Sequence, residues 1–296
     1  MTGPRILVID GNVAEIRARQ IAALGYDSGT GYARVLHRIN ASLQIDIVLA
    51  ADGDPQFPAG VSLDDYDGVT MTGSALNIYN GGAPVMRQID LAKAVFAAGV
   101  PFFGSCWGLQ VAVTAAGGEV RANPQGREFG FARRILLTDA GREHPVFAGK
   151  PVAFEAPTIH RDRIATLPTG ATVLALNDFG IQAASFAFGR GTFWGVQYHP
   201  EYDYVDIAAA ADRYGATLVS EGMFRDNSAL STFAADLRVL QANPSDTALL
   251  RKHGLGPAMQ IEALRLLEIH NWLQAQVLPR RNGMKPEPDA LRQSPQ

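Results

Sequence analysis

One stretch decides the fold of this chain: Phe102-Phe103-Gly104-Ser105-Cys106-Trp107-Gly108-Leu109-Gln110. It contains the only cysteine among the 296 residues. An apolar run over residues 100–103 leads into it and predicts a buried strand, and a helical pattern over residues 109–116 leads out of it. Cys106 therefore lies on a predicted strand-to-helix turn, with a glycine two residues before it and another two residues after it.

This glycine bracket is typical of a nucleophile elbow, here with Cys in place of Ser. Such a turn is tight and holds its central residue in a strained, often positive-φ conformation, so its neighbours must lack bulk. The sulfur then projects above the sheet edge, and the backbone N–H of Trp107 points to the place where an oxyanion would form. Most lone cysteines are small buried hydrophobic residues, so this interpretation requires a base elsewhere in the chain.

Strands and helices alternate along the first part of the chain. We expect strands over residues 5–10, 44–50, 68–71 and 101–104, and helices over residues 13–24 and 84–98. This alternation predicts an α/β fold, with a doubly wound, mostly parallel sheet flanked by helices. Ligands of such sheets bind at the carboxyl ends of the strands. Gly73 and Cys106 both lie at such ends, so we expect them to face one pocket.

The pattern changes after residue 119. Short β-rich runs up to residue 197 indicate mixed or antiparallel strands added to the sheet, and helical patterns dominate after residue 202. We therefore expect a domain of residues 1–202, a helical C-terminal extension of residues 203–279 and a flexible tail of residues 280–296. An apolar stripe at helical spacing either packs on the body of the protein or forms a partner surface; it consists of Leu266, Ile269, Leu273 and Val277.

The candidate base lies in His199-Pro200-Glu201. In an extended chain, residues i and i+2 project to the same side. Glu201 can then bind one imidazole nitrogen of His199 and leave the other nitrogen facing the thiol, which is the logic of a Cys–His–carboxylate triad. His160 is the one serious rival, and we place it in a loop near the pocket rim. One cysteine and scattered histidines give no ligand pair at metal spacing, so we expect no metal and no cofactor.

Composition limits the class of protein. With 47% hydrophobic and 19% charged residues and a net charge of −3, the chain has the makeup of an ordinary globular protein, and nothing in it indicates a nucleic-acid or anionic-membrane partner. A single cysteine forms no internal disulfide, which fits a reducing compartment. No apolar stretch approaches the roughly 18 residues of a membrane span, and the first residues do not form a signal peptide. We therefore expect a cytoplasmic protein.

With both halves of the site in place, the sequence resembles the class I, or triad, glutamine amidotransferases, in particular their GMP-synthase-like glutaminase branch. Residues 104–110 are similar to the family motif G-x-C-x-G-x-Q, and residues 195–201 to G-V-Q-F-H-P-E. Arg127-Glu128-Phe129-Gly130 and His160-Arg161-Asp162 resemble segments of that branch. The resemblance covers about residues 5–202. It departs from the family at Thr72-Gly73-Ser74, which has fewer glycines than many oxyanion loops, and at Ile159, where the branch often has serine.

The resemblance implies a flavodoxin-like fold and a specific chemistry. Cys106 attacks the side-chain amide of the substrate glutamine, the N–H groups of Gly73 and Trp107 hold the oxyanion, and His199, oriented by Glu201, protonates the leaving ammonia. A γ-glutamyl thioester is then hydrolysed to glutamate. By the same resemblance three residues lie near the substrate: Gln110, Ser74 and His160. A helix-packing role for Gln110 stays open.

Three hypotheses follow for the function. The first is a glutaminase subunit that hands ammonia to a separate synthase, because nothing in this sequence resembles a synthase domain. The second is a self-sufficient γ-glutamyl hydrolase or transferase that acts on a small γ-glutamyl compound. The third is a non-catalytic regulatory protein with the same fold, which the intact Cys106, His199 and Glu201 disfavour. The sequence leaves the first two open, together with the ammonia acceptor and the oligomeric state.

Overall fold

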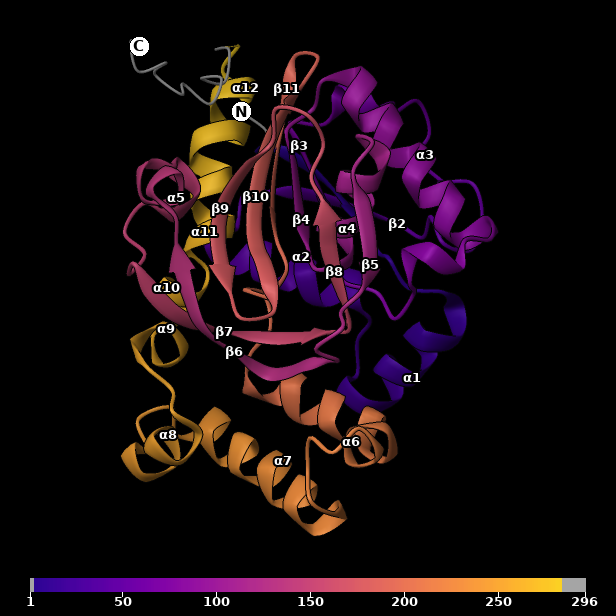
Figure 1. The fold of residues 1–296 in the computed structure, drawn as a ribbon. Helices are drawn as coiled ribbons and strands as arrows, with labels where there is room; N and C mark the ends of the chain where they lie inside the picture. The colour runs from indigo at the N-terminus through magenta and orange to yellow at the C-terminus, as the bar shows by residue number, and fades with distance from the viewer. Residues whose placement is uncertain (1–2, 284–296) are drawn as a thin grey trace.

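The computed structural model describes residues 3–283 of the chain. Its core is a sheet of nine strands in the order β2-β1-β3-β4-β11-β10-β9-β6-β7, drawn in Figure 1. A separate two-stranded sheet pairs β5 with β8. The strands are β1 (Arg5–Ile9), β2 (Gln44–Val48), β3 (Gly68–Met71), β4 (Phe102–Ser105), β5 (Glu119–Ala122), β6 (Glu128–Leu137), β7 (Ala153–His160), β8 (Asp162–Thr166), β9 (Thr172–Asn177), β10 (Gly180–Phe188) and β11 (Gly191–Val196).

The sheet has a parallel half and an antiparallel half. Strands β2, β1, β3, β4 and β11 pair in parallel, and the pairs from β11 through β10, β9 and β6 to β7 are antiparallel. Strands β3 and β4 are buried along their whole length, which explains why they appear in the sequence as unbroken apolar runs. The predicted α/β class, with a largely parallel sheet flanked by helices and extended by antiparallel strands, is confirmed.

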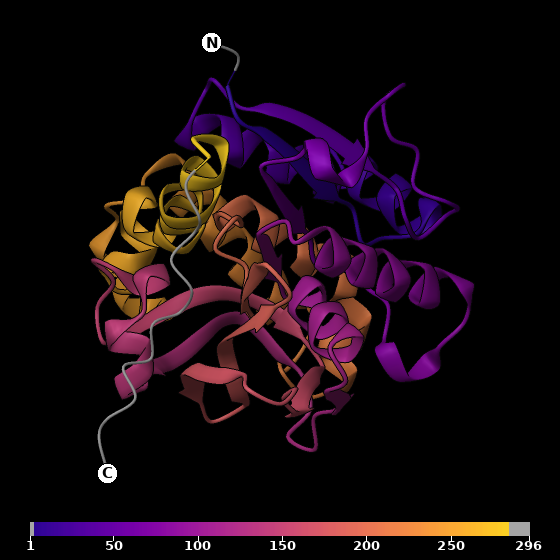
Figure 2. The same cartoon turned by 90° about the horizontal axis from the view of Figure 1, so that it is seen from above.

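Helices cover both faces of the sheet and extend beyond one end of it, as Figures 1 and 2 show. The α-helices are α1 (Ala14–Leu24), α2 (Ser28–Ile39), α3 (Ala83–Ala98), α4 (Trp107–Ala115), α5 (Asp139–Glu143), α6 (Tyr204–Ser220), α7 (Asn227–Ala242), α8 (Thr247–His253), α9 (Pro257–Gln260), α10 (Glu262–Arg265), α11 (Leu267–Trp272) and α12 (Leu278–Arg281). Short 3₁₀ turns are η1 (Leu63–Asp65), η2 (Ile78–Asn80) and η3 (Pro145–Phe147), and η4 (Leu273–Val277) is a π-helical turn.

The sequence pattern did not predict helix α2. Its start is fixed by Asp27, whose side chain accepts a hydrogen bond from the backbone N–H of Thr30 at 2.8 Å. Tyr32, Val35 and Leu36 form its buried side. Both signals are local, an N-cap residue followed by apolar residues at helical spacing, and they are readable in the sequence.

The C-terminal helices divide into two groups. Helices α6 to α8 form one layer with its own apolar cluster, whereas α11 and η4 pack on the sheet beside β1 and β4. The predicted apolar stripe belongs to the core that also contains Phe103, so its packing on the body of the protein is confirmed. The helical pattern of residues 257–278 does not form one continuous helix, because Ile261 adopts extended backbone and separates α9 from α10.

The last described helix, α12, continues two residues into the predicted tail. Arg280 donates hydrogen bonds to the carbonyl oxygens of Tyr66 at 3.3 Å and Gly99 at 2.9 Å. Residues 284–296, the rest of the predicted tail, lie outside the described residues. Within residues 3–283, no helix combines the length and the apolar character needed to cross a membrane.

Candidate active site

Cys106 occupies a strained turn between β4 and α4. Its φ is +53°, in the region that favours glycine, and its side chain is buried. A Cβ added to Gly104 would lie 2.5 Å from the backbone carbon of Gly108, and one added to Gly108 would lie 2.5 Å from the carbonyl oxygen of Met71 in β3. The glycine bracket is therefore required because α4 packs directly on β3 and β4. The predicted positive-φ elbow is confirmed.

His199 and Glu201 follow directly after β11, the strand that neighbours β4. The backbone N–H of Cys106 donates to the carbonyl oxygen of Val196 at 2.7 Å, which fixes the elbow to the end of β11. Nδ1 of His199 lies 2.7 Å from Oε1 of Glu201. Within the described part of the chain, Nε2 of His199 is buried and has no hydrogen-bond partner. The histidine thus uses one nitrogen inside the protein and keeps the other for a ligand or the thiol.

The electrostatics of His199 favour the imidazolium. Burial alone opposes a charge on the ring, but the neighbouring Glu201 carboxylate and Cys106 side chain outweigh it and raise the pKa of His199 to about 10. At neutral pH the ring is therefore protonated and can act as a proton donor.

The His199 ring is held between two surfaces. On one side it stacks on the Tyr202 ring, with centroids 4.1 Å apart and planes inclined by 7°. On another side it packs so closely on Gly73 that a Cβ at position 73 would collide with Cε1 of the ring. The carbonyl oxygen of Gly73 accepts hydrogen bonds from Asn12 at 3.4 Å and from the Thr72 hydroxyl at 3.0 Å, which hold this loop in place.

These residues border a cavity of about 700 Å³. Six of the residues that the sequence predicted for the site line it together: Cys106, His199, Gly73, Ser74, Gln110 and His160. Their positions in the sequence are far apart. The carboxyl ends of β3, β4 and β11 bring five of them to one edge of the sheet, as predicted for an open α/β sheet, and the end of β7 brings His160.

The sequence model of the family "Glutamine amidotransferase class-I" matches residues 24–205. The chain belongs to the class I glutamine amidotransferase family. A γ-glutamyl-L-1-hydroxyisopropylamide hydrolase of Pseudomonas sp is 35% identical over 278 residues, which is 93% of this chain and 94% of that protein. Together, the family and this hydrolase identify the chain as an amide-hydrolysing enzyme.

Other relatives match this amidotransferase over shorter stretches or in fold alone. The GMP synthase of Nitrosomonas eutropha is 36% identical over 187 residues, but the match spans 61% of this chain and 34% of that protein. The matched stretch thus corresponds to about a third of that GMP synthase. A glutamine amidotransferase structure from Thermotoga maritima has a TM-score of 0.64 at 18% identity and covers 93% of this chain and 98% of its own, which shows a shared fold.

The three residues expected near the substrate differ in what they can offer it. The side-chain amide of Gln110 donates to Gln197 at 3.3 Å, and the Ser74 hydroxyl accepts from the Leu76 N–H at 3.2 Å. His160 is the buried last residue of β7, so its placement in a loop was wrong. Its Nε2 lies 2.8 Å from Glu128 and its Nδ1 2.9 Å from the Asp162 carbonyl oxygen, and both nitrogens are therefore engaged within the protein.

Sequence reasoning missed most of the polar lining of the cavity. Of the charged side chains in the described part of the chain, four arginines and one aspartate line it: Arg19, Arg127, Arg161, Arg213 and Asp162. Tyrosines also contribute: Tyr79, Tyr202 and Tyr214. Because these residues come from α1, η2, β5–β8 and α6, no single stretch of sequence marks them as a group.

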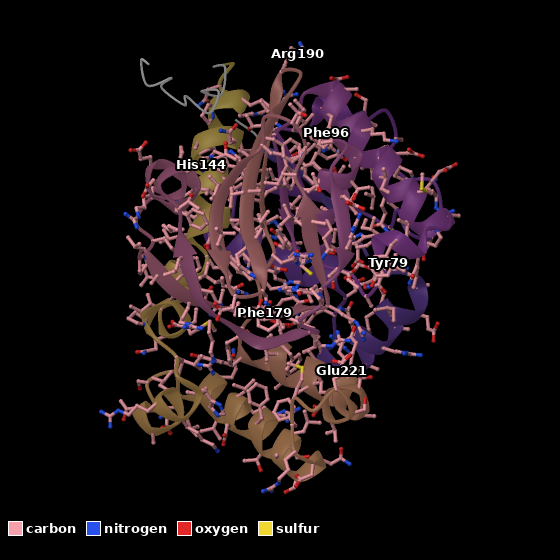
Figure 3. All side chains as sticks on the ribbon, viewed as in Figure 1. Tyr79, Phe96, His144, Phe179, Arg190 and Glu221 are labelled. Atoms are coloured by element: carbon pink, nitrogen blue, oxygen red, sulfur yellow. The ribbon has the colours of Figure 1, made fainter. Side chains whose placement is uncertain are left out.

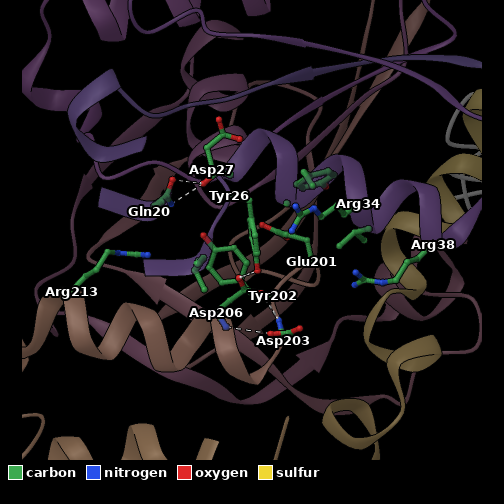
Figure 4. Close-up of a pocket in the computed structure, with 15 residues that line it drawn as sticks. Gln20, Tyr26, Asp27, Arg34, Arg38, Glu201, Tyr202, Asp203, Asp206 and Arg213 are labelled. Carbon is green, nitrogen blue, oxygen red and sulfur yellow. Dashed lines mark hydrogen bonds between the residues drawn. The ribbon is translucent and has the colours of Figure 1, made fainter. Parts of the chain in front are cut away.

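A second, smaller cavity of about 110 Å³ lies beside Glu201 (Figure 4). Glu201 lines it, and Oε2 of Glu201 is buried without a hydrogen-bond partner in the described residues. Gln20, Tyr202 and Arg213 line both cavities and so form the wall between them. In residues 3–283, no group of three or more His, Cys, Asp or Glu side chains is arranged to hold a metal ion.

Proposed function

We propose that this amidotransferase is a stand-alone hydrolase of γ-glutamyl amides. One observation carries the proposal: the relative that matches almost the whole chain, helical extension included, is a γ-glutamyl amide hydrolase. The cavity supports it, because about 700 Å³ is the size of sites that enclose drug-sized ligands, typically about 300–1,000 Å³, and leaves room for an amine larger than ammonia.

All the residues that take part in the proposed chemistry lie within residues 1–202. The Cys106 sulfur attacks the carbonyl carbon of the γ-amide, and the N–H groups of Gly73 and Trp107 stabilise the oxyanion. As the C–N bond breaks, His199 gives its proton to the leaving nitrogen, and a γ-glutamyl thioester remains on Cys106. Water then attacks the thioester while His199 takes a proton from it, and the C–S bond breaks to release glutamate.

Glu201 is the proposed orienting residue of this triad. Its hydrogen bond to Nδ1 fixes the ring so that Nε2 faces the reacting atoms, and its charge favours the imidazolium that donates the proton. Within residues 203–279, α11 and η4 have a supporting role in the proposal, because they pack on the strands that carry the triad.

The test uses the purified full chain without any partner. Glutamate and free amine are quantified with glutamine and with a γ-glutamyl alkylamide such as γ-glutamylethylamide, and Cys106→Ala serves as control. We expect cysteine-dependent release of glutamate and ethylamine, and a γ-glutamyl adduct on the intact protein by mass spectrometry. The adduct is expected to be absent from Cys106→Ala, and its presence there would refute the role of Cys106.

The second candidate is a glutaminase subunit that delivers ammonia to a separate synthase. The partial match to GMP synthases favours it, because this chain corresponds to only a part of those proteins. It predicts turnover of glutamine that a synthase partner stimulates, and no turnover of γ-glutamylethylamide. The same assay therefore separates the two candidates.

A further inference from the structure

Arginines dominate the charge of the active-site cavity, although the chain as a whole carries a net charge of −3. Four arginines line the cavity, and Asp162 is the one carboxylate among the lining residues that the structure describes. The carboxylate of Asp162 already accepts hydrogen bonds from Asn77 at 2.8 Å and Tyr79 at 2.9 Å. A cavity with this excess of positive charge concentrates anionic ligands.

Three of the four arginines either belong to helix α6 or bind the residue at its C-terminal end. Arg213 belongs to α6 itself, and Glu221 follows the last residue of that helix (Figure 3). The Glu221 carboxylate lies 2.9 Å from Arg127 and 3.0 Å from Arg161. Because one carboxylate serves two guanidinium groups, this cluster keeps a net positive charge at the cavity.

Arg213 has a donor that the protein does not use. Its Nη1 is buried and has no hydrogen-bond partner within the described part of the chain. A buried donor of a charged group without an acceptor costs free energy, which an anionic ligand at that place would offset. Of the four arginines that line the cavity, Arg213 is the one with a buried guanidinium nitrogen that has no acceptor within the described residues.

Arg213 lines the same cavity as His199 and Tyr202. In the proposed reaction His199 gives its proton to the leaving nitrogen, so that nitrogen must approach the His199 ring. Tyr202 stacks on this ring and, together with Arg213, forms part of the wall between the two cavities (Figure 4). Arg213 is therefore a candidate contact for a substituent on the leaving nitrogen.

We propose that the amine part of the substrate carries a carboxylate, as in a γ-glutamyl amino acid, and that Arg213 binds this carboxylate. The proposal rests on the γ-glutamyl hydrolase function given above and adds the substrate class. Water cleaves the γ-amide bond through the Cys106 thioester, and the products are glutamate and a free amino acid. No co-reactant besides water is required.

Two substrates that differ in a single group test this proposal. γ-Glutamylglycine ends in a carboxylate, and γ-glutamylglycinamide has a neutral carboxamide of nearly the same shape in its place. We expect kcat/KM of the wild-type chain to be about 10- to 100-fold higher for γ-glutamylglycine, the range for a hydrogen bond to a charged group. Equal values for the two substrates would overturn the proposal.

Variants at position 213 assign the preference to one residue. Arg213→Gln is expected to bring the ratio of the two kcat/KM values close to one, and Arg213→Lys, which keeps the charge, to retain part of it. Arg238→Gln is the matched control, because Arg238 is exposed on the neighbouring α7 and lines neither cavity. A ratio that survives in Arg213→Gln would overturn the role of Arg213. If that variant fails to fold, Arg213→Lys takes its place, and a ratio that keeps the full wild-type value in Arg213→Lys would overturn the role of Arg213.

Failure of this proposal is distinguishable from failure of the proposed function. If the chain releases glutamate from both glycine derivatives at the same rate and Cys106→Ala does not, the hydrolase function stands and the carboxylate preference is wrong. If the wild-type chain releases no glutamate from any γ-glutamyl amide, the hydrolase function itself is wrong and this proposal is refuted with it.

Discussion

Glu268→Gln is expected to destabilise the folded protein although the side chain keeps its size. Glu268 belongs to α11 and is fully buried. Its carboxylate lies 2.9 Å from Nζ of Lys150, which is also buried, and it accepts a hydrogen bond from the Tyr198 hydroxyl. Tyr198 immediately precedes His199, so this cluster joins the C-terminal helices to the segment that carries the candidate base.

The magnitude follows from the charge that the substitution leaves behind. The glutamine side chain would carry no charge, and Lys150 would remain in the interior with neutral acceptors: the carbonyl oxygens of Leu264 and Arg265 and the new side-chain amide. Removing one partner of a buried ion pair typically costs about 3–5 kcal/mol. The additional substitution Lys150→Met removes the stranded charge, so the double variant is expected to recover about 1–3 kcal/mol relative to Glu268→Gln alone.

The assay is urea unfolding followed by tryptophan fluorescence, since Trp107, Trp194 and Trp272 are all buried in the folded protein. Glu262→Gln is the matched control. Its carboxylate pairs with Arg38 at 2.9 Å, but both side chains are about half exposed. An exposed pair contributes up to about 1 kcal/mol. The reasoning is refuted if Glu268→Gln costs no more than Glu262→Gln, or if the double variant is no more stable than Glu268→Gln.

Three further predictions concern the site. The charge of Glu201 helps to raise the pKa of His199 to about 10, whereas burial lowers that pKa. Glu201→Gln removes this charge, so the alkaline limb of the pH profile of kcat/KM is expected to move to lower pH. Glu15 is exposed, and Glu15→Gln should leave the limb in place. Gly73→Ala displaces the His199 ring and is expected to lower kcat/KM by about 100-fold, and retained activity would contradict the packing seen here. Burial, and next the charge of Asp203, raise the pKa of Asp206 from 3.8 to about 7, so between these values the folded state holds a proton that the unfolded chain has released. The free energy of unfolding, measured in urea at each pH, should therefore fall as pH rises from about 4 to about 7, and Asp206→Asn should flatten this slope.

The sequence by itself determined the elbow and the candidate triad segments. The strand, the turn and the helix around Cys106 are adjacent in the chain. The glycines at positions 104 and 108 indicate the close packing of that turn, because a side chain at either position would collide with backbone atoms. His199 and Glu201 are two residues apart, so their hydrogen bond depends on local backbone geometry alone. The alternation of strands and helices likewise predicted the α/β fold, because hydrophobic periodicity is a local property.

Other local features were readable but were not predicted. Helix α2 has an N-cap and an apolar side, and the break at Ile261 separates segments that each keep helical spacing. The two short strands β5 and β8 pair only with each other, away from the main sheet. Propensity for such short elements is weak, and packing decides whether they form.

Only the tertiary structure decided which side chains meet around the cavity. It pairs His160 with Glu128, brings Arg127 and Arg161 to Glu221, and leaves a buried guanidinium nitrogen of Arg213 without a partner in the described residues. Each of these contacts joins segments that are distant in the chain. A sequence states the residue types and their local spacing, whereas contacts between distant segments depend on how the elements pack on one another. For this reason the reacting groups were predictable from the sequence, and the residues proposed to select the substrate were not.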